Sequence, residues 1–467
     1  GTSDPDFVEL EGVEGDMVSF DDVSLQPETS YSYRLRLSRN DGYSPYSGVS
    51  KIRTYPLVEE GTFLIRDTFF YKGSKGTSTC ESHYLAYSLN NYESGTFGAG
   101  PIRYDSGSGR FRVVLTNDGW SFVDPEGYLF FGAGINSVPP AENFSRIKLP
   151  EDLRAVGLNH LANWSAFESI NKAGPPMPYT TRELFLQGYK NLEQRTKDLF
   201  DDGVIPVFDP EFEYFADLLA QQVAEKYAND PYCIGIFSDN ELPLYSNEKY
   251  GDLLSRFLQI EDKTDPNYLA ARDWMITRSG TADFEWTDAD SYDWHGFLAA
   301  SYYRTVNDAL KKHAPDVLFL GSRLHGAAKG YANIFVESAP YVDVFSINYY
   351  GPCTPDPEQM DMWETGVDKP FLISEFYAKG FDVDLDNSGG AGYHVPTQGD
   401  RALYFENFVL ALLSRRNCVG YQWFRFQDDA SNKGLVDAGE NWYAPLRQSF
   451  EKVNKDLYQL RSFLRNE

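Results

Sequence analysis

Cysteine and basic residues are both scarce in this sequence. Only four cysteines occur among 467 residues, and none stands at the CxxC or CxxxH spacing of a zinc site, which argues against a zinc centre and against a disulfide scaffold. Cys233 and Cys418 lie in apolar runs, so we expect both to be buried thiols. Lysine and arginine number 42 against 69 acidic residues, a net charge of −27, whereas nucleic acids and anionic membranes attract basic surfaces. We therefore expect no nucleic-acid partner.

Long hydrophobic runs are missing as well. No apolar run reaches about 18 residues, so we expect no membrane span. The chain begins GTSDPDF, without the basic and apolar segments of a secretory signal, although removal of a signal would leave such a start. Asp382, Asp384 and Asp386 alternate as in a calcium loop, but Asn387 and Tyr393 replace its glycine and its closing glutamate. We expect no metal and no other cofactor.

Aromatic residues are what the sequence has in abundance. They make up 16% of the chain, with 32 Tyr, 33 Phe and 8 Trp, while the hydrophobic share of 42% and the charged share of 24% are ordinary for a globular protein. Aromatic side chains fill hydrophobic cores, and they also line grooves in which their faces stack against sugar rings. Their place in the fold decides between these two uses.

The beginning of the chain has the pattern of a small β structure. Apolar and polar residues alternate from Tyr31 to Leu37, an Asn-Asp-Gly turn follows, and a second strand is expected over 49–54. This stretch resembles the second half of a fibronectin type III module, with Tyr31 at the place of its corner tyrosine. A complete sandwich needs about 100 residues, so we expect residues 1–56 to be a partial module. Residues 57–110, rich in Gly, Ser and Tyr, are expected to form an irregular wrapping linker.

From residue 111 onward, short apolar strands alternate with helical segments. A β-hairpin comes first, and eight further strands are expected, which is the pattern of a (β/α)8 barrel. Apolar residues that recur every four positions from Leu298 to Leu310 predict one of the helices. The fold class is therefore α/β, a TIM barrel over 111–467 preceded by a small all-β segment. The expected barrel strands are 129–135, 158–164, 204–208, 233–237, 318–322, 344–348, 371–374 and 420–424.

The stretch between the fourth and fifth expected strands is much longer than the unit of about 31 residues in an average barrel. Residues 245–296 are therefore expected to be an insertion, with Trp274, Trp286 and Trp294 in or near it. Its place after a strand end predicts that it forms a wall of the active-site groove.

Acidic residues follow two of the expected barrel strands. Asp239, Asn240 and Glu241 come after the fourth strand, and Glu375 comes after the seventh. Catalytic groups of such barrels project from the carboxyl ends of the strands, so we expect both glutamates at the barrel mouth. Two facing carboxylates can cleave a glycosidic bond, one as proton donor and the other attacking or stabilising the anomeric carbon. A separation of about 5–5.5 Å retains the configuration, and one of about 6.5–9.5 Å inverts it. Either glutamate alone would also fit a structural ion pair.

Asn-Glu after the fourth strand and Glu after the seventh are the pattern of the retaining (β/α)8 glycosidases. Further motifs follow in order at 123–127, 157–159, 163–165, 207–212, 320–323, 343–348 with Tyr350, 369–370, 375–376, 423–424, 428 and 434–437. With these motifs, much of residues 117–460 resembles the glycoside hydrolase family 50 β-agarases. The resemblance implies a retaining glycosidase barrel.

The resemblance also implies roles for the residues at the strand ends. Glu241 would be the general acid/base, protonated near neutral pH, and Glu375 would be the nucleophile that forms a glycosyl-enzyme. Asn240 would bond the sugar 2-hydroxyl, and Tyr350, or Tyr349 if the strand end is shifted by one residue, would donate to Glu375. Trp423 equally fits a plug in the top layer of the barrel. The remaining sugar contacts would be stacking by Trp164 and Trp423 and hydrogen bonds from Asn163, Asn136, Arg323 and His325.

Some residues depart from the family pattern. Tyr377 and Gln422 replace histidines, Arg425 replaces an uncharged residue, and Ser374 replaces a glycine. These departures surround the expected substrate and therefore suggest a related galactan, one that carries sulfate. Because guanidinium matches such oxyanions with two bonds, the sulfate partners would be Arg323, Lys379 and Arg425.

The sequence thus predicts a retaining glycoside hydrolase that cleaves β-galactosidic bonds in an agar-type or related, sulfated algal galactan. We expect it to act from a chain end of an oligo- or polysaccharide by double displacement. Polymers are cut outside the cytosol, so we expect a secreted, periplasmic or cell-surface protein. Two alternatives stay open: another enzyme of the clan, such as a β-galactosidase, carrageenase or mannanase-like enzyme, and a non-catalytic carbohydrate-binding barrel.

Overall fold

The computed structural model divides into two compact units, residues 1–65 with 84–89 and residues 66–83 with 90–467. Cys233 and Cys418 are free and buried, which confirms the expected core thiols. Within the described ranges, no helix is long and apolar enough to cross a membrane. The structure describes residues 25–26, 29–36, 38–39, 42–53, 62–66, 84–88, 95–249, 251–351 and 355–466.

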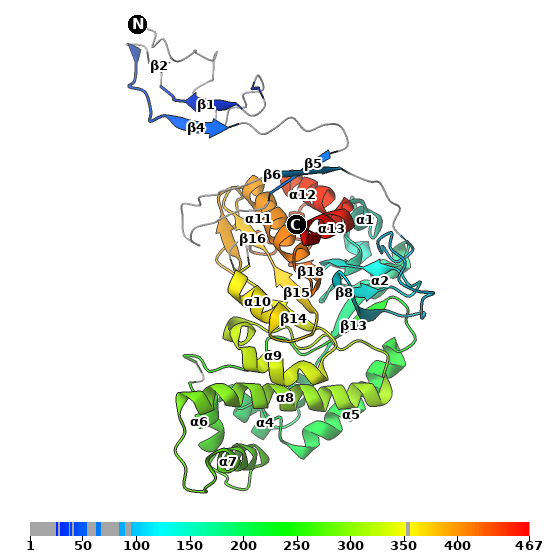
Figure 1. Ribbon diagram of the computed structural model, residues 1–467, viewed down its shortest axis with the longest axis vertical. Coiled ribbons are helices and arrows are strands. Elements are labelled where there is room, and N and C mark those ends of the chain that lie inside the picture. Colours follow the sequence, from blue (N-terminus) through cyan, green and yellow to red (C-terminus); the bar gives the residue numbers. More distant parts are fainter. Residues whose placement is uncertain are drawn as a thin grey trace. The chain divides into compact units, whose positions relative to one another are not determined.

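The smaller unit contains short strands in antiparallel pairs (Figure 1). The Tyr31 hydroxyl accepts a 2.7 Å hydrogen bond from the backbone N–H of Gln26, the kind of contact back to the chain that a corner tyrosine makes. The fibronectin type III module itself stays a prediction, and most of the expected linker lies outside the described residues. The strands of residues 25–88 are β1 (Ser30–Tyr33) with β4 (Ser50–Arg53), β2 (Ser38–Arg39) with β3 (Gly42–Tyr43), and β5 (Thr62–Arg66) with β6 (Tyr84–Ser88).

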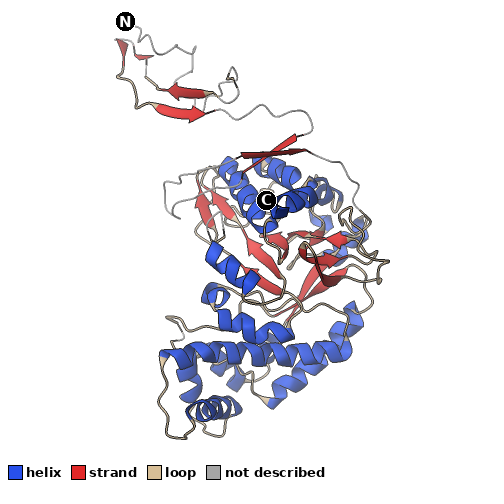
Figure 2. Ribbon diagram, viewed as in Figure 1, coloured by secondary structure: helices blue, strands red, loops and turns tan. Residues whose placement is uncertain are grey.

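Seven parallel strands form the central sheet of the larger unit, and helices surround them (Figure 2). Their order around the sheet is β13-β12-β11-β10-β18-β15-β14. Neighbours in this order are mostly separated along the chain by helical segments, as in a βα barrel. In chain order the strands are β10 (Gly132–Ile135), β11 (His160–Leu161), β12 (Tyr179–Glu183), β13 (Cys233–Ser238), β14 (Phe345–Asn348), β15 (Phe371–Phe376) and β18 (Cys418–Trp423).

Residues 318–324 close the gap between the two edge strands, β13 and β14. On one side, the backbone N–H of Ile236 donates to the Leu318 carbonyl at 2.9 Å. On the other side, the N–H of Leu324 donates to the Ser346 carbonyl at 2.8 Å. The segment forms only isolated bridges, but it occupies the fifth of the eight barrel positions. The predicted (β/α)8 fold is therefore confirmed.

The third barrel strand does not lie where the sequence pattern placed it. Residues 204–208 form no strand and instead connect to α5 (Pro210–Tyr227), although Val204, Ile205 and Val207 are buried. The third strand is β12, whose sequence Tyr-Thr-Thr-Arg-Glu pairs with β13. A short apolar run has the same pattern whether it is buried in a strand or in a connection. The polar residues of β12 give no pattern that would identify it as a barrel strand.

The longest helix is α8 (Asp288–His313), which begins with a capping box formed by Thr287 and Asp290. The four regularly spaced residues from Leu298 to Leu310 have no exposed surface, so the expected apolar face is confirmed. The other helices are α1 (Glu151–Ala155), α2 (Phe167–Ala173), α3 (Leu186–Tyr189), α4 (Gln194–Asp201), α6 (Leu253–Leu258), α7 (Pro266–Ser279), α9 (Ala332–Ser338), α10 (Pro357–Thr365), α11 (Gln398–Leu413), α12 (Ala444–Lys455) and α13 (Leu457–Asn466), with β16 (Ala378–Gly380) and β17 (Tyr393–Val395) between α10 and α11.

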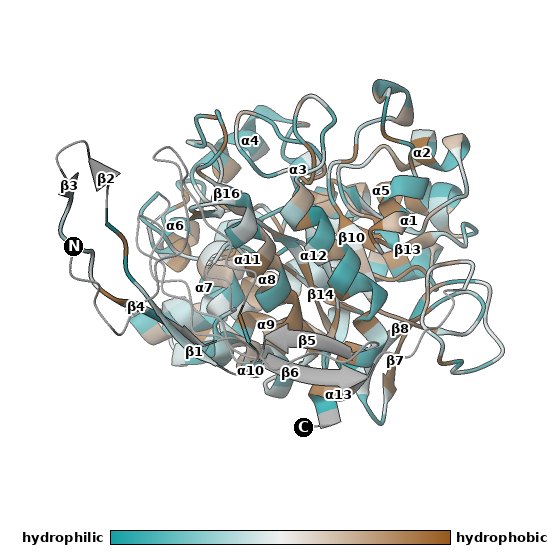
Figure 3. Ribbon diagram, turned by 90° about the horizontal axis from the view of Figure 1, so that it is seen from above, coloured by the Kyte–Doolittle hydropathy of each residue, from teal (hydrophilic) through white to brown (hydrophobic). Residues whose placement is uncertain are grey.

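A small antiparallel sheet covers the amino end of the barrel. It consists of β7 (Arg112–Thr116), β8 (Gly119–Val123) and β9 (Leu129–Phe130). In Figure 3, hydrophobic residues gather on central strands such as β10 and β13, while hydrophilic residues lie on outer helices such as α12. This sheet thus closes the amino end of the barrel. A ligand site can therefore form only at the other end, where the carboxyl ends of the strands lie. One buried cluster joins this sheet to the first residues of the barrel strands: Phe111, Phe122, Phe130, Ile234, Leu318, Val344, Leu372 and Val419.

A polar layer fills the middle of the barrel. His160 of β11 is 1% exposed, and a Cβ on Gly134 would lie 2.3 Å from its ring, so only glycine fits on the neighbouring strand β10. The Gln422 side-chain amide lies 3.1 Å from His160 Nε2 and donates to Thr180 Oγ1 at 3.0 Å. Burial lowers the pKa of His160 to about 3, so the imidazole is neutral near neutral pH.

Acid should destabilise the barrel through His160. The unfolded imidazole titrates near pH 6.5 and the folded one near pH 3, so the stability that the neutral ring supplies is complete above pH 6.5 and is lost as the pH falls. At about 1.4 kcal/mol per pH unit, roughly 2 kcal/mol is lost on going from pH 6.5 to about pH 5. In urea unfolding, we expect His160→Gln to lose about 2 kcal/mol less over this interval than the wild type.

The matched control for this prediction is Thr180→Ala, which changes the same polar layer at a side chain that carries no charge at any of these pH values. We expect this variant to keep the wild-type acid sensitivity. Equal losses in wild type and His160→Gln would show that the buried histidine does not govern the acid response.

Candidate active site

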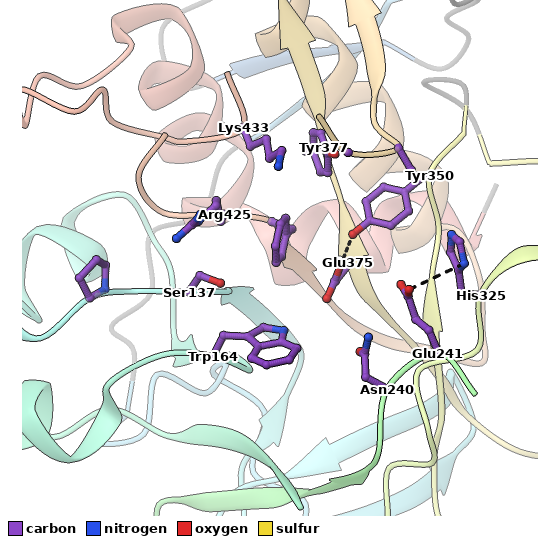
Figure 4. A pocket seen from close by; sticks show the side chains of 14 residues that line it. Ser137, Trp164, Asn240, Glu241, His325, Tyr350, Glu375, Tyr377, Arg425 and Lys433 are labelled. Carbon is purple, nitrogen blue, oxygen red and sulfur yellow. Dashed lines mark hydrogen bonds and ion pairs between the residues drawn. The ribbon is translucent and has the colours of Figure 1, made fainter. Parts of the chain in front are cut away.

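A pocket of about 590 Å³ opens at the carboxyl ends of the barrel strands (Figure 4). Asn240 and Glu241 follow β13, Tyr350 follows β14, and Glu375 lies near the end of β15. The two glutamates that the sequence places at the barrel mouth therefore line one pocket. Among the described residues, the lining consists of Ser137, Pro139, Trp164, Asn240, Glu241, His325, Tyr350, Glu375, Tyr377, Gly390, Ala391, Phe424, Arg425 and Lys433.

Both carboxylate oxygens of Glu375 accept hydrogen bonds. Arg323 Nη2 donates to Oε1 in an ion pair, and the Tyr350 hydroxyl donates to Oε2. Arg323 has no exposed surface and Glu375 is 5% exposed. Burial, together with the charge of Glu375, raises the pKa of Tyr350 well above its usual value, so this hydroxyl stays a donor. Arg323 Nε also donates to Asn240 Oδ1 at 2.8 Å, which orients this amide beside Glu375. A cation and a neutral donor thus hold the two oxygens of Glu375 in place.

Glu241 has different surroundings. Asn348 Nδ2 donates to its Oε1 at 2.7 Å, and Ser374 Oγ donates to Asn348 Oδ1 at 2.7 Å. Its Oε2 lies 3.8 Å from His325 Nδ1, and its side chain is 31% exposed. Glu241 is thus held by an amide, whereas Glu375 is held by a guanidinium. Two carboxylates in unlike surroundings are what separates a proton donor from a nucleophile.

Asp239 fixes the turn that carries residues 240–241. Its carboxylate accepts hydrogen bonds from the backbone N–H groups of Leu186 and Gln187, both at 2.8 Å, and from the Tyr302 hydroxyl at 2.6 Å. Burial raises the pKa of Asp239 to about 6, against the opposing effect of these hydrogen bonds. Asp239 thereby ties the turn to the start of α3 and to α8, a positioning role that the sequence alone did not reveal.

Left-handed backbone conformations gather around the pocket. Five residues that are not glycine have positive φ there: Ser137 (54°), Trp164 (67°), Asp239 (58°), Glu241 (52°) and Arg323 (59°). Such conformations cost on the order of 1–3 kcal/mol each, persist where the surroundings enforce them, and cluster at functional sites. Three of the five line the pocket, and the other two are adjacent to lining residues in the chain or bonded to them.

Several residues that the sequence predicts as substrate contacts do line the pocket. Trp164 is 47% exposed, and the Arg182 guanidinium lies 3.6 Å from its ring centroid, so one face of the indole is covered and the other is the candidate stacking face. Tyr377 is nearly buried and contributes to the wall beside Tyr350, at 5.2 Å between ring centroids. His325 and Arg425 are also among the lining residues.

Trp423 lies in the core and not in the pocket. Its ring has no exposed surface and packs against Phe376, Phe405 and Phe450, so it offers no face to a sugar. Side chains alternate along a strand: Gln422 points into the barrel, and Trp423 therefore points outward to α11 and α12. The alternative role, a plug in the top layer of the barrel, is not borne out either, because the ring lies between the sheet and the helices α11 and α12.

Besides Arg323, which is buried behind Glu375, four other predicted contacts lie outside the pocket lining as well. Tyr349 packs against side chains of α10 and α11, so Tyr350 is the tyrosine that bonds Glu375. Asn136 donates to carbonyl groups near the ends of β15 and β18, and Gln422 belongs to the polar layer described above. Asn163 is 4% exposed. The side chains of Tyr349, Asn136 and Gln422 thus serve the barrel itself, whereas Asn163 Nδ2 is buried without a hydrogen-bond partner within the described residues.

Of the three predicted sulfate partners, only Arg425 lines the pocket. Arg323 is buried behind Glu375, as described above. Lys379 is 1% exposed, and its Nζ donates to the carbonyl groups of Asn387 and Gly389 at 3.0 and 3.1 Å. Lys379 therefore holds a loop in place and does not reach a ligand.

Lys433 lines the pocket beside Arg425, and sequence reasoning missed it. It belongs to the long connection after β18, where no strand end marks a position as close to the site. Its Nζ lies 3.1 Å from an Asp429 oxygen. The other lining residues that were missed are Ser137, Pro139, Gly390, Ala391 and Phe424.

The insertion at 245–296 does not contribute to the described lining of this pocket, contrary to expectation. Trp294 is fully buried and packs against Trp274 and Phe257. Phe208 and Phe297 join the same cluster. Trp274 and Trp294 thus build a core between α6, α7 and α8, because a helical insertion of this size must bury its own apolar side, whereas Trp286 is 39% exposed.

Similarity to known proteins is clear, although no protein-family model matches the chain. The chain is 25% identical over 475 residues to beta-agarase B and 28% identical over 331 residues to beta-agarase A, both of Vibrio sp. (strain JT0107). The matches cover 76% and 61% of this chain but only 49% and 32% of those relatives. The chain therefore spans about half, or less, of the length of these curated relatives.

Solved structures show the same relationship. The crystal structure of BpGH50 matches with a TM-score of 0.74 and 27% identity, over 88% of this chain and 98% of that chain. The agarase AgWH50C shares the fold, with a TM-score of 0.64 and 22% identity over 79% of this chain and 66% of that one. These similarities confirm the resemblance to the family 50 β-agarases and the barrel fold that it implies.

Proposed function

We propose that this protein is a retaining glycoside hydrolase that cleaves β-galactosidic bonds in an agar-type or related algal galactan. The observation that carries the proposal is the pair of pocket carboxylates in unlike surroundings. Glu375 is bonded by Arg323 and Tyr350, and Glu241 by Asn348. The beta-agarase relatives support a galactan as the polymer.

In the proposed mechanism, the ionised Glu375 attacks the anomeric carbon while Glu241 gives its proton to the leaving oxygen. The glycosidic bond breaks and a covalent glycosyl-enzyme forms. Glu241 then takes a proton from a water molecule, whose oxygen attacks the same carbon and releases Glu375. Asn240, whose Oδ1 is held by Arg323, directs its amide nitrogen to the sugar 2-hydroxyl, a contact that strengthens in the transition state.

Cleavage from a chain end is part of the proposal. The pocket of about 590 Å³ falls in the range of about 300–1,000 Å³ that is typical of sites for small ligands, and Gly390, Ala391 and Phe424 contribute walls to it. Such a pocket fits a terminal sugar unit better than the middle of a polymer. Because polymers of this kind are cut outside the cytosol, a secreted, periplasmic or cell-surface location belongs to the proposal.

Product analysis tests the proposed activity. The purified protein is incubated with oligosaccharides of agarose, porphyran, carrageenan, galactan and mannan. We expect release of one small product of constant size from the agar-type substrates from the earliest time point. A ladder of product sizes would contradict action from a chain end. Cleavage confined to mannan or carrageenan would contradict the proposed substrate class.

A further inference from the structure

One wall of the candidate pocket carries positive charge. Arg425 follows β18 directly, and Lys433 comes from the connection that leads to α12. In the view of Figure 4, both side chains lie across Glu375 from Glu241 and His325. The chain as a whole has a net charge of −27, so two neighbouring cations in its pocket run against the composition.

A single carboxylate is shared between these two cations. Asp429 Oδ2 lies 3.0 Å from Arg425 Nη1 and 3.1 Å from Lys433 Nζ. Burial alone would raise the pKa of Asp429, but hydrogen bonds from the Ser431 backbone and from Lys433 lower it, so Asp429 is ionised. One negative charge balances only one of the two positive charges. The wall therefore keeps a surplus of one positive charge.

The Arg425 guanidinium also has an unused donor. Its Nε is buried and has no hydrogen-bond partner within the described residues, which is costly for a charged group unless a ligand completes the site. The Lys433 side chain is only 11% exposed, so most of its stem is buried in the wall of the pocket that it lines. A neutral sugar hydroxyl needs neither an unpaired guanidinium donor nor a lysine, because amide and carboxylate groups form hydrogen bonds with it equally well.

We propose that Arg425 and Lys433 bind an anionic substituent of the substrate, and that this substituent is a sulfate ester on a galactose unit. Guanidinium offers paired N–H donors that match the oxygens of such a group, and ammonium adds a point charge. A carboxylate on a modified sugar has the same chemistry and is the other source to be tested. The inference rests on the proposed galactan-cleaving function and names the substrate class within it.

The test uses three galactan oligosaccharides of one length: sulfated, chemically desulfated, and carrying a carboxylate in place of the sulfate. We expect kcat/KM for the sulfated compound to exceed that for the desulfated one at least about tenfold. Arg425→Met and Lys433→Met should each lower kcat/KM for the sulfated compound roughly tenfold more than kcat/KM for the desulfated compound. Added salt should reduce the preference.

Arg425→Lys should recover only part of the preference, because it restores charge without the paired donors. Arg272→Met is the control: this exposed residue of α7 pairs with Asp273 and lies outside the pocket lining, so its variant should behave as wild type. Equal kcat/KM for sulfated and desulfated compounds, or equal effects of Arg425→Met on both, would overturn the proposal. Preference for the carboxylate compound over the sulfated one would overturn the choice of sulfate.

Failure of the proposed hydrolysis is a separate result. If the wild type cleaves none of the three compounds, calorimetric titration with the same compounds still decides the binding question. Tighter binding of the sulfated compound, lost in Arg425→Met, would support the anionic subsite without the activity. Binding of equal strength for all three would overturn it.

Discussion

Replacement of Glu375 by glycine is expected to abolish hydrolysis, and added azide is expected to restore turnover with an α-galactosyl azide as the product. Without the carboxylate, a small anion fits the space beside the anomeric carbon and attacks from the side of Glu375, so the configuration inverts once. An aryl glycoside is the suitable substrate, because its leaving group needs little protonation. The rate with and without azide is measured, and NMR assigns the anomer.

The matched variant Glu241→Gly should give the opposite anomer. Its hydrolysis of oligosaccharides should fall by about 10²- to 10⁴-fold, because the leaving oxygen loses its proton donor, while the aryl glycoside is affected less. Glu375 still forms the glycosyl-enzyme, and azide then attacks from the face that water would use, which yields the β-galactosyl azide. The same anomer from both variants would refute the assigned roles, and an inverted sugar from the wild type would refute retention.

The sequence sufficed to locate the two glutamates because an acidic residue at the end of a wholly buried strand is a strong local signal. Glu241 lies in the turn after β13, and Glu375 is the fifth residue of β15. β13 and β15 are buried at every position, and their ends reach the barrel mouth whatever the connecting helices do. The same signal does not identify the tyrosine that donates a hydrogen bond to Glu375. Tyr349 and Tyr350 are neighbours, and only the end of β14 at Asn348 decides which of them turns toward the pocket.

Other parts of the fold lack such local signals. Tyr179–Glu183 has too few apolar residues to indicate a strand, yet it is held in the barrel by its pairing with β13. Trp423 and Gln422 differ by one position, and the alternation of a strand sends one to the core and the other to the barrel interior. Both were predicted to contact the sugar, but Gln422 lies in the polar layer of the barrel and Trp423 lies in the core outside it.

Lys433 is a site residue that could not be predicted from the sequence, for a third reason. It lines the pocket because residues 427–436 fold back on themselves, with Gln427 bridged to Val436, and because Asp428 accepts a 2.6 Å bond from the Gly434 N–H. Neither contact leaves a periodic pattern in the sequence. Residues of long connections reach a site through such particular hydrogen bonds, and so the second cation of the wall emerged only from the structure.

The buried ion pair of Arg323 and Glu375 predicts the second large effect. Their side chains are 0% and 6% exposed, so Arg323→Met leaves a carboxylate buried without its cation. Loss of one partner from a buried pair costs about 3–5 kcal/mol, and we expect the free energy of unfolding in urea to fall by that amount. kcat/KM should fall too, because the guanidinium that bonds Glu375 Oε1 and orients Asn240 is gone.

The double variant Arg323→Met/Glu375→Gln separates the ion pair from packing. With both charges removed, no unpaired ion remains, so the double variant should be more stable than Arg323→Met alone. Additive losses from the two substitutions would contradict the ion pair and reduce Arg323 to a packing residue. Arg323 has a φ of 59°, and methionine must adopt the same left-handed backbone in the single and the double variant. The cost of that strain therefore cancels in the comparison, and the difference in stability reports the charges.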